Sequence, residues 1–326
     1  MTKLYLVTGA TGHLGTVLLE KLLERNEKVR VLTLPNEKDL LKEKDVEIFL
    51  GDVTDKDSME AFFDVDMYDF VTLIHAAALI SIGSKANPML WEVNVKGASN
   101  VMELALKHQV DRVIYVSSVH AILEKEPGQI ITEVDEFSKD LVVGQYAKTK
   151  AEAAQMVLEF AKKGLNVSIV HPSGMIGPGD IHDKNHSVRT IKAMKKGRIF
   201  VSIAGGYDFV DSRDVVDGIL ACETKGKKGQ CYLLTGNYIS ITELLNLVRK
   251  LDGKRPIHIQ VPYGIIKAFS PIGEWVANLF GRMHTIFTPY SVAALHSNSH
   301  FSHEKASKEL GYQPRPILET IKASLS

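Results

Sequence analysis

Hydrophobic residues in the first half of the chain form short continuous runs that alternate with longer amphipathic stretches. The runs are rich in β-branched residues, which predicts buried strands. In the stretches between them apolar residues recur every three or four positions, as at Leu14, Leu18 and Leu22, which predicts helices with one buried face. Strands alternating with helices build a parallel sheet covered on both faces. The predicted strands are residues 3–8, 28–34, 46–50, 70–75, 112–117 and 166–171.

This pattern changes after His171. Five glycines and prolines fall between residues 172 and 179, which predicts a loop that leaves the sheet. Residues 207–223 again have the pattern of extended chain followed by helix. The chain of 326 residues is therefore expected to form a Rossmann-type, doubly wound α/β fold with a smaller, mostly helical substrate domain near the C-terminus. The predicted dinucleotide-binding domain comprises residues 1–171 with a return segment at about 207–235, and the predicted substrate domain comprises 172–206 and 236–326.

Composition excludes several classes of protein. Lys+Arg and Asp+Glu are both 39, so no basic field favours nucleic acid as a partner. Cys222 and Cys231 are too few for a disulfide framework and lack the spacing of a zinc site, so we expect reduced core residues and no bound metal. The chain begins with a strand pattern and not with that of a signal peptide, which favours a cytoplasmic location.

Two apolar segments bear on membrane contact. Residues 70–82 are too few to span a bilayer and contain His75, which favours a buried strand. Residues 259–280 are apolar but are interrupted by prolines and charges, which favours helices of the substrate domain. No stable membrane insertion is therefore expected, while contact of 259–280 with a membrane surface stays open.

A glycine-rich turn, Thr8-Gly-Ala-Thr-Gly-His-Leu-Gly15, joins the first strand to the first helix. Gly9 permits the tight turn, Gly12 lets the backbone approach a pyrophosphate, and Gly15 lets the helix pack on the strand. The unpaired N–H groups at the helix start attract the anion. The segment therefore predicts a dinucleotide site whose cradle is Gly9, Thr11, Gly12, His13, Leu14 and Gly15.

The choice of cofactor depends on the end of the second strand, where an acid would bind the ribose of NAD and a base the phosphate of NADP. The strand ends at Leu34, which is neither. Asn36 and Lys38 follow and can meet a phosphate from the loop, so NADP is slightly preferred to NAD. Lys38 is equally well explained as an ordinary solvated charge.

Two further strand ends carry candidate cofactor contacts. Asp52, next to Val53, can accept a hydrogen bond from the adenine amino group, although a helix-capping role is the alternative. At the end of the fourth strand, Ala76 and Ala77 are small enough to let a cofactor lie across the sheet. His75, just before them, fits a hydrogen-bonded strand end better than an acid or base.

The candidate chemistry centres on Tyr146 and Lys150, which stand four residues apart and hence on one face of a helix. A nearby ammonium favours the phenolate, so Lys150 is expected to lower the pKa of Tyr146 toward the working pH. Ser118, at the end of the strand over 112–117, can donate to a substrate oxygen as negative charge grows on it. Each feature alone has an ordinary structural explanation, and their coincidence at one sheet edge favours a catalytic site.

Taken together, these motifs resemble the extended (atypical) short-chain dehydrogenase/reductases of the NAD-dependent epimerase/dehydratase type. The end of the chain fits as well, and the dihydroflavonol 4-reductase and 3β-hydroxysteroid dehydrogenase branch is the most similar. One departure is Leu34, where many NADP-using members have arginine. The motifs that carry the resemblance are the glycine turn, Gly51-Asp-Val53, His75-Ala-Ala-Ala78, Asn94, Ser117-Ser118, Tyr146-xxx-Lys150, His171-Pro-Ser-Gly-Met-Ile-Gly-Pro178 and Glu309-Leu-Gly-Tyr-Gln-Pro314.

The resemblance implies a role for each residue of the site. Ser118 would polarise a carbonyl, and Tyr146 would donate the proton. Lys150 would hold the nicotinamide ribose while tuning Tyr146. Asn94 would support a water-linked proton path, and Pro172 would border the nicotinamide ring.

We therefore expect an NAD(P)-dependent carbonyl or alcohol reductase acting on a small molecule held near residues 174–206 and from 238 onward. A nucleotide-sugar epimerase or dehydratase with tightly bound NAD is the first alternative, and a non-catalytic dinucleotide sensor the second. The chain is a monomer or a homodimer, in which helices near 88–108 and 145–163 would pair. A sugar diphosphate would need basic side chains, and the candidates, which also fit a solvated helix face, are Arg189, Lys192, Lys195, Lys196 and Arg198.

Overall fold

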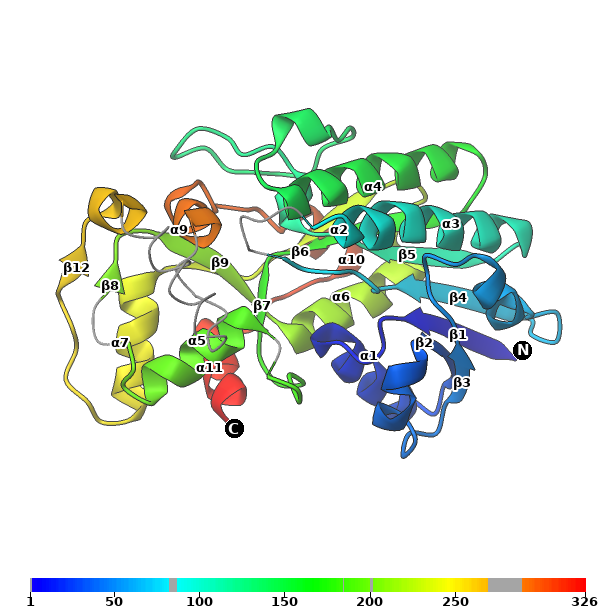
Figure 1. Cartoon of the computed structure of the whole chain (residues 1–326), viewed down its shortest axis with the longest axis horizontal. Coiled ribbons are helices and arrows are strands. Elements are labelled where there is room, and N and C mark those ends of the chain that lie inside the picture. Colours follow the sequence, from blue (N-terminus) through cyan, green and yellow to red (C-terminus); the bar gives the residue numbers. More distant parts are fainter. Residues whose placement is uncertain (1, 82–86, 184, 200–201, 269–288) are drawn as a thin grey trace.

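The computed structural model describes residues 2–81, 87–183, 185–199, 202–268 and 289–326 (Figure 1). The six predicted strands are confirmed, with shifts of one residue at several ends, and they lie in one parallel sheet of seven strands in the order β10-β6-β5-β4-β1-β2-β3. This is the predicted Rossmann-type arrangement. The strands are β1 (Lys3–Thr8), β2 (Lys28–Thr33), β3 (Glu47–Leu50), β4 (Phe70–His75), β5 (Arg112–Val116), β6 (Val167–Pro172) and β10 (Cys231–Leu234).

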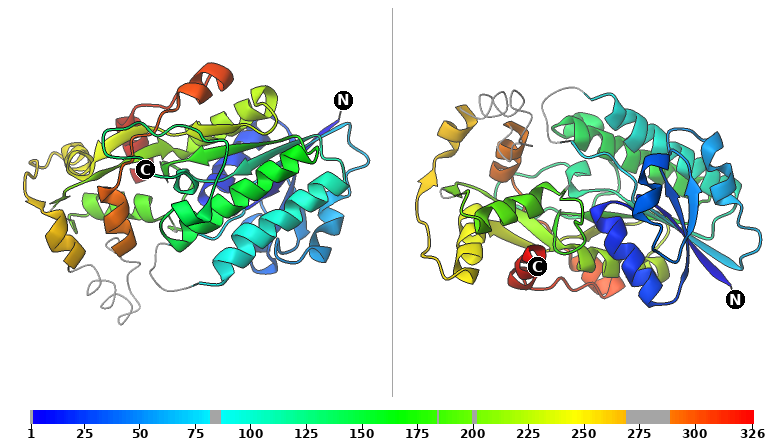
Figure 2. Two further views of the ribbon diagram at one scale, coloured as in Figure 1. Left: turned by 90° about the horizontal axis from the view of Figure 1, so that it is seen from above. Right: turned by 60° about the horizontal axis from the view of Figure 1, so that its bottom comes forward.

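Helices cover both faces of this sheet, as the nearly continuous apolar strands require. In β1, Leu4 and Leu6 face one core, while Tyr5 and Val7 face the other. The two helical layers lie on opposite sides of the sheet in Figures 1 and 2. The first layer contains α3 (Ala98–Lys107) and α4 (Gln145–Lys162), and the second contains α1 (His13–Glu24), α6 (Ser212–Lys225) and α10 (Glu304–Leu310).

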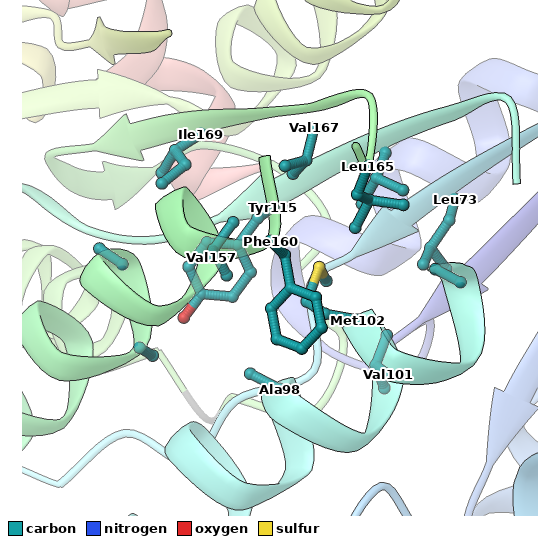
Figure 3. Close-up of a cluster of buried hydrophobic side chains, with 14 of the residues drawn as sticks. Leu73, Ala98, Val101, Met102, Tyr115, Val157, Phe160, Leu165, Val167 and Ile169 are labelled. Carbon is teal, nitrogen blue, oxygen red and sulfur yellow. The ribbon is translucent and has the colours of Figure 1, made fainter. Parts of the chain in front are cut away.

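The apolar faces of α3 and α4 pack against the main sheet of the same chain. Figure 3 shows Phe160 of α4 and Met102 of α3 in the cluster that packs against Tyr115 of β5. Val101 of α3 is fully buried there. Burial of each such side chain contributes roughly 1.5–3 kcal/mol to folding. A twofold pairing through these helices would therefore have to use their outer faces, and the oligomeric state stays a prediction.

A smaller lobe follows β6 and contains strands as well as the expected helices. Its three-stranded sheet has the order β11-β9-β7, and its core is separate from the two cores of the main sheet. A loop was predicted over 172–179, but Gly174–Ile176 forms β7. Gly174 permits this because a Cβ there would come within 2.9 Å of the Tyr207 ring. The lobe contains β8 (Ser202–Ile203), β9 (Gly206–Asp211), β11 (Asn237–Ser240), β12 (Gln260–Val261), α5 (His186–Lys195), α7 (Ile241–Leu251), α9 (Pro289–His296) and α11 (Ile317–Leu325).

The chain passes between the two parts more than once. After β9, helix α6 packs against α1 and β10 joins the main sheet. Near the C-terminus, α10 packs against α6 and β10. The domain boundaries stay a prediction. Cys222 and Cys231 are buried and not bonded to each other, as expected.

None of the helices in the described part combines the length and hydrophobicity needed to cross a bilayer. Of the apolar segment 259–280, residues 269–280 lie outside the described residues. The strand expected in 70–82 is β4, which ends at His75, and Ile80 beyond it is exposed.

Candidate active site

Two cavities meet at the glycine turn, at the carboxyl ends of the main-sheet strands. Cavity A, about 450 Å³, lies toward the ends of β2 and β3. Cavity B, about 470 Å³, lies toward the ends of β5 and β6. Both are lined by Gly9, Gly12, His13 and Ala76, so the glycine turn stands between them. This is the position at which open α/β sheets bind ligands.

The backbone of the glycine turn is packed too closely for any side chain at two positions. Gly9 has φ +75°, and a Cβ there would lie 2.6 Å from the Ala77 nitrogen. A Cβ on Gly15 would lie 2.1 Å from the Gly9 carbonyl oxygen. Helix α1 begins at His13, and Gly12 before it provides no side-chain cap. The first-turn N–H groups therefore face the cavities without a helical partner, which suits an anion.

His13 fastens this turn to the smaller lobe. The carbonyl oxygen of Pro178 can only accept a hydrogen bond, so the Nε2 atom at 2.7 Å carries the proton. The Asn185 amide nitrogen then donates to Nδ1 at 2.8 Å. Desolvation lowers the pKa of His13, which agrees with a neutral ring. His13 therefore fixes the turn in place, and it lines both cavities.

Cavity A contains an acid that the sequence did not single out. The Thr11 hydroxyl donates to Glu37 Oε2 at 2.7 Å, and both residues line the cavity together with Leu34. Asn36 and Lys38 are exposed and do not line it. Glu37 lies in the 3-10 helix Pro35–Leu40, after the end of β2. The sequence did not show that this helix turns the Glu37 side chain toward cavity A.

Asp52 and Val53 also line cavity A. Asp52 Oδ1 accepts hydrogen bonds from the backbone nitrogen and the hydroxyl of Thr54, each at 2.8 Å. Asp52 thus stabilises the turn after β3. Its expected contact with an adenine amino group stays a prediction.

His75 ends β4 and, although its strand end was a candidate for cofactor contact, it lines neither cavity. It is fully enclosed, and its Nδ1 lies 2.7 Å from the Thr8 hydroxyl. Burial, with a smaller effect of Lys150, lowers its pKa to about 3, so the ring is neutral. It is therefore a hydrogen-bonded strand end, as expected, while Ala76 and Ala77 after it line cavity A.

Tyr146, Lys150 and Ser118 come together in cavity B with the glycine turn. Helix α4 begins at Gln145, so Tyr146 and Lys150 occupy its first two turns. The Tyr146 and Ser118 side chains are hydrogen-bonded. Lys150 Nζ donates to the Val116 carbonyl oxygen at 3.0 Å. The predicted juxtaposition of phenol, ammonium and strand-end hydroxyl is therefore present.

The electrostatics of this group differ from the expectation. Burial raises the pKa of Tyr146 to about 12, and the hydrogen bond with Ser118 offsets this only in part. Desolvation lowers the pKa of Lys150 to about 7. The ammonium is thus only partly charged near neutral pH and donates to the backbone of Val116, so it does not bring the pKa of Tyr146 to the working pH as predicted.

Asn94 is buried beside this group but lines neither cavity. Its amide nitrogen donates to the Leu79 carbonyl oxygen at 2.9 Å and to the Thr149 hydroxyl at 3.1 Å, and its oxygen accepts from the Leu79 nitrogen at 2.8 Å. Asn94 lies in a π-helical turn, Glu92–Gly97. In this structure it holds the segment after β4 against α4, and its part in a proton path stays a prediction.

The far wall of cavity B comes from β6 and the smaller lobe. Pro172 lines it at the end of β6, and the preceding His171 places Nδ1 3.0 Å from the Ser118 carbonyl oxygen. His120 and Tyr207, which the sequence did not single out, also line it. His120 Nε2 and the Tyr207 hydroxyl are 2.9 Å apart. Because the two residues are 87 positions apart in sequence, no local sequence pattern predicts that they meet.

The basic residues considered for a sugar diphosphate lie in and after α5 and line neither cavity in the described part of the chain. Lys192 forms an ion pair with Asp183 at 2.5 Å. The others are Arg189, Lys195, Lys196 and Arg198.

Comparison with known proteins agrees with this geometry. Residues 5–234 match the model of the NAD dependent epimerase/dehydratase family. The chain is 32% identical to Sterol demethylase protein B of Methylococcus capsulatus, over 95% of this chain and 93% of that protein. It is 26% identical to a 3-beta-hydroxysteroid dehydrogenase of Mycolicibacterium neoaurum, over 95% of this chain and 86% of that protein. The crystal structure of gox2253 superposes with a TM-score of 0.82 at 30% identity, covering 99% of this chain and 96% of that one.

The chain therefore belongs to the NAD dependent epimerase/dehydratase family of extended short-chain dehydrogenase/reductases. The predicted resemblance, including the branch with 3β-hydroxysteroid dehydrogenases, is confirmed. The family and the fold together indicate an NAD(P)-binding protein.

Proposed function

We propose that the protein is an NAD-dependent oxidoreductase that reduces a ketone or aldehyde, or oxidises the corresponding alcohol. The observation that carries the proposal is that Tyr146, Ser118 and Lys150 line the same cavity as Gly9 and Gly12. A proton donor and a dinucleotide cradle that share one cavity are what hydride transfer to a carbonyl needs. The dehydrogenase among the relatives supports the same class of reaction.

The two cavities fit a dinucleotide that crosses the glycine turn. The missing Cβ positions of Gly9 and Gly15 and the free N–H groups of α1 suit the pyrophosphate. The adenosine half would lie in cavity A, beside Glu37, and the nicotinamide half in cavity B, beside Pro172. When bound, the nicotinamide gives or accepts the hydride.

The chain supplies the proton chemistry. Because the pKa of Tyr146 is raised to about 12 by burial, the phenol is protonated at neutral pH and able to donate to an oxygen that gains negative charge. Ser118 is hydrogen-bonded to the Tyr146 hydroxyl and lines the same cavity, so a substrate oxygen placed between the two hydroxyls could exchange that bond for one from each of them. His171 fixes the backbone of Ser118 from below. At neutral pH the phenol is therefore in the protonated form that carbonyl reduction requires.

NAD is the proposed cofactor, in place of the slight preference for NADP drawn from the strand end. Glu37 presents a carboxylate in cavity A that suits ribose hydroxyls and repels a 2′-phosphate. The two residues that would favour the phosphate, Asn36 and Lys38, lie outside the cavity.

An epimerase or dehydratase with retained NAD is the second candidate, because the family model includes both activities. The reductase is preferred since, in the described part of the chain, Lys150 is the one basic Lys or Arg side chain lining cavity A or B. A nucleoside diphosphate would find few cations there.

One assay separates the candidates. NADH consumption at 340 nm is followed with a panel of ketones and aldehydes, and UDP-glucose and dTDP-glucose turnover is followed in parallel by chromatography. The proposal expects stoichiometric NADH loss with a carbonyl and no sugar conversion. Sugar conversion without net NADH loss would support the epimerase or dehydratase. Tight NADH binding with neither reaction would support a sensor.

A further inference from the structure

A third cavity, cavity C, adjoins the site on the side away from the glycine turn. Its volume is about 260 Å³, and its walls come from the segment after β5, the start of α4, β9 and α9. It shares His120 and Tyr207 with cavity B. Ala147 lines it, while the preceding Tyr146 lines cavity B. Within the described lining, this one pair of side chains therefore stands between the two cavities, beside the proton donor.

The separating pair is uncharged and held edge-on to the donor. The His120 ring is stacked on Tyr207 with centroids 6.0 Å apart and meets the Tyr146 ring edge to face, also at 6.0 Å. Desolvation lowers the pKa of His120 to about 4, so the imidazole is neutral at pH 7. Tyr207 is only half-buried and reaches His120 from the other lobe. This neutral aromatic pair presents ring faces to the space around it and carries no charge near the proton donor.

The lining of cavity C is suited to binding a hydrocarbon group. Leu123, Leu141 and Val143, at its rim, are 48%, 57% and 81% exposed. Exposed apolar side chains gathered on one hollow mark a binding surface more often than chance. Its described lining contains no Lys or Arg, and its one acid, Glu124, is exposed to solvent. The described lining therefore offers no cationic partner to an acidic group.

Resting on the proposed function, we propose that cavity C is the second half of the substrate site. It takes the uncharged, apolar body of a ketone whose carbonyl lies beside Tyr146, with the body passing the His120–Tyr207 pair. The adjacency of the two cavities selects this occupant, because a group bound in cavity C is separated from a carbonyl beside Tyr146 only by the width of the shared wall. The pair then selects for substrates long enough to reach beyond it.

The test uses ketones with one reacting group and a growing hydrocarbon tail, namely cyclohexanone and its 4-ethyl, 4-butyl and 4-hexyl derivatives, with NADH. We expect kcat/KM to rise along the series by up to about fourfold per added methylene that is buried. Two variants test the place of the tail. Ala294→Phe fills cavity C from α9, and Leu141→Asp puts a charge at its rim. The matched control is Met67→Asp, at a position 77% exposed that lines none of the three cavities.

In both cavity C variants the ratio of kcat/KM for 4-hexylcyclohexanone to that for cyclohexanone should fall toward one, while Met67→Asp keeps the wild-type ratio. Reduction of cyclohexanone with no gain along the series, or a gain untouched by both variants, overturns the inference and leaves the proposed function standing. If no ketone in the series is reduced, calorimetry of cyclohexanol and 4-hexylcyclohexanol with NAD-loaded protein separates the two ideas. Equal affinity for the two alcohols then overturns the inference as well. Thermal unfolding and NADH binding check that each variant is folded.

Discussion

Thr11 donates a hydrogen bond of 2.7 Å to Glu37 and so joins the glycine turn to the segment after β2. The bond fixes a carboxylate at the wall of cavity A. In the proposed binding mode the pair would lie beside the adenosine ribose, where NAD and NADP differ, and this gives the first prediction.

Glu37→Gln should weaken NADH binding and reduce discrimination against NADPH. Loss of charge-assisted hydrogen bonds to ribose hydroxyls is expected to raise the Kd of NADH by roughly 10- to 100-fold, since such bonds contribute about 1.5–3 kcal/mol. Fluorescence titration with both cofactors measures this. Lys38→Gln is the control, because Lys38 is exposed and does not line the cavity. A stronger effect from Lys38 than from Glu37 would reverse the proposed preference for NAD.

Tyr146→Phe should lower kcat/KM by about 10²- to 10⁴-fold, the range for loss of a general acid, while NADH binding stays near wild type. Tyr115→Phe is the matched control. Tyr115 is a buried tyrosine on β5 whose hydroxyl has no partner in the described part of the chain, and it lines neither cavity A nor cavity B. Steady-state kinetics should show little change in the control. Equal turnover in the two variants would remove Tyr146 from the chemistry.

Lys150→Met should stabilise the fold while it destroys turnover. Desolvation lowers the pKa of Lys150 from 10.5 to about 7, so between these pH values the unfolded state binds more protons. The free energy of unfolding of the wild type should therefore rise with pH from 7 toward 10.5, and the full cost of the buried charge is present below pH 7. The variant removes that cost but also the hydrogen bond to Val116. A net gain on the order of 2–4 kcal/mol at pH 7 follows, and it should shrink by pH 9.

Urea unfolding at pH 7 and pH 9 checks this, with Lys148→Met as control because Lys148 is exposed on the same helix. A variant that is less stable than wild type at pH 7, or a difference from wild type that is the same at both pH values, would mean that Lys150 is not held at a lowered pKa. NADH titration of the same protein should also show weakened binding.

Much of the fold could be predicted from the sequence because the signals were local. The continuous apolar strands of the main sheet and the Leu14, Leu18, Leu22 stripe of α1 depend on periodicity alone, and all three leucines are buried. The motif residues of cavity B were also predicted, since each stands at a strand end or in one helical turn.

The features that could not be predicted from the sequence depend on contacts between segments that are far apart in the chain. β7 was not predicted because it begins at Gly174, in a segment whose glycines and prolines are typical of a loop. It is a strand because it pairs with β9, which is distant in sequence. Glu37 and the His120–Tyr207 pair were missed for the same reason, since a turn and a tertiary contact place them. The pKa of Tyr146 could not be predicted either, because it depends on how much solvent the fold removes.

The most direct measurement of the central claim follows a single hydrogen. The protein is incubated with NADH that carries deuterium on one face of C4 and with a ketone that it turns over, and the alcohol is analysed by mass spectrometry. The account predicts that one of the two C4-labelled cofactors transfers deuterium to the carbinol carbon, and that Tyr146→Phe slows this transfer without altering NADH binding. Absence of deuterium from the product with both labelled cofactors, while NADH is bound, would contradict it.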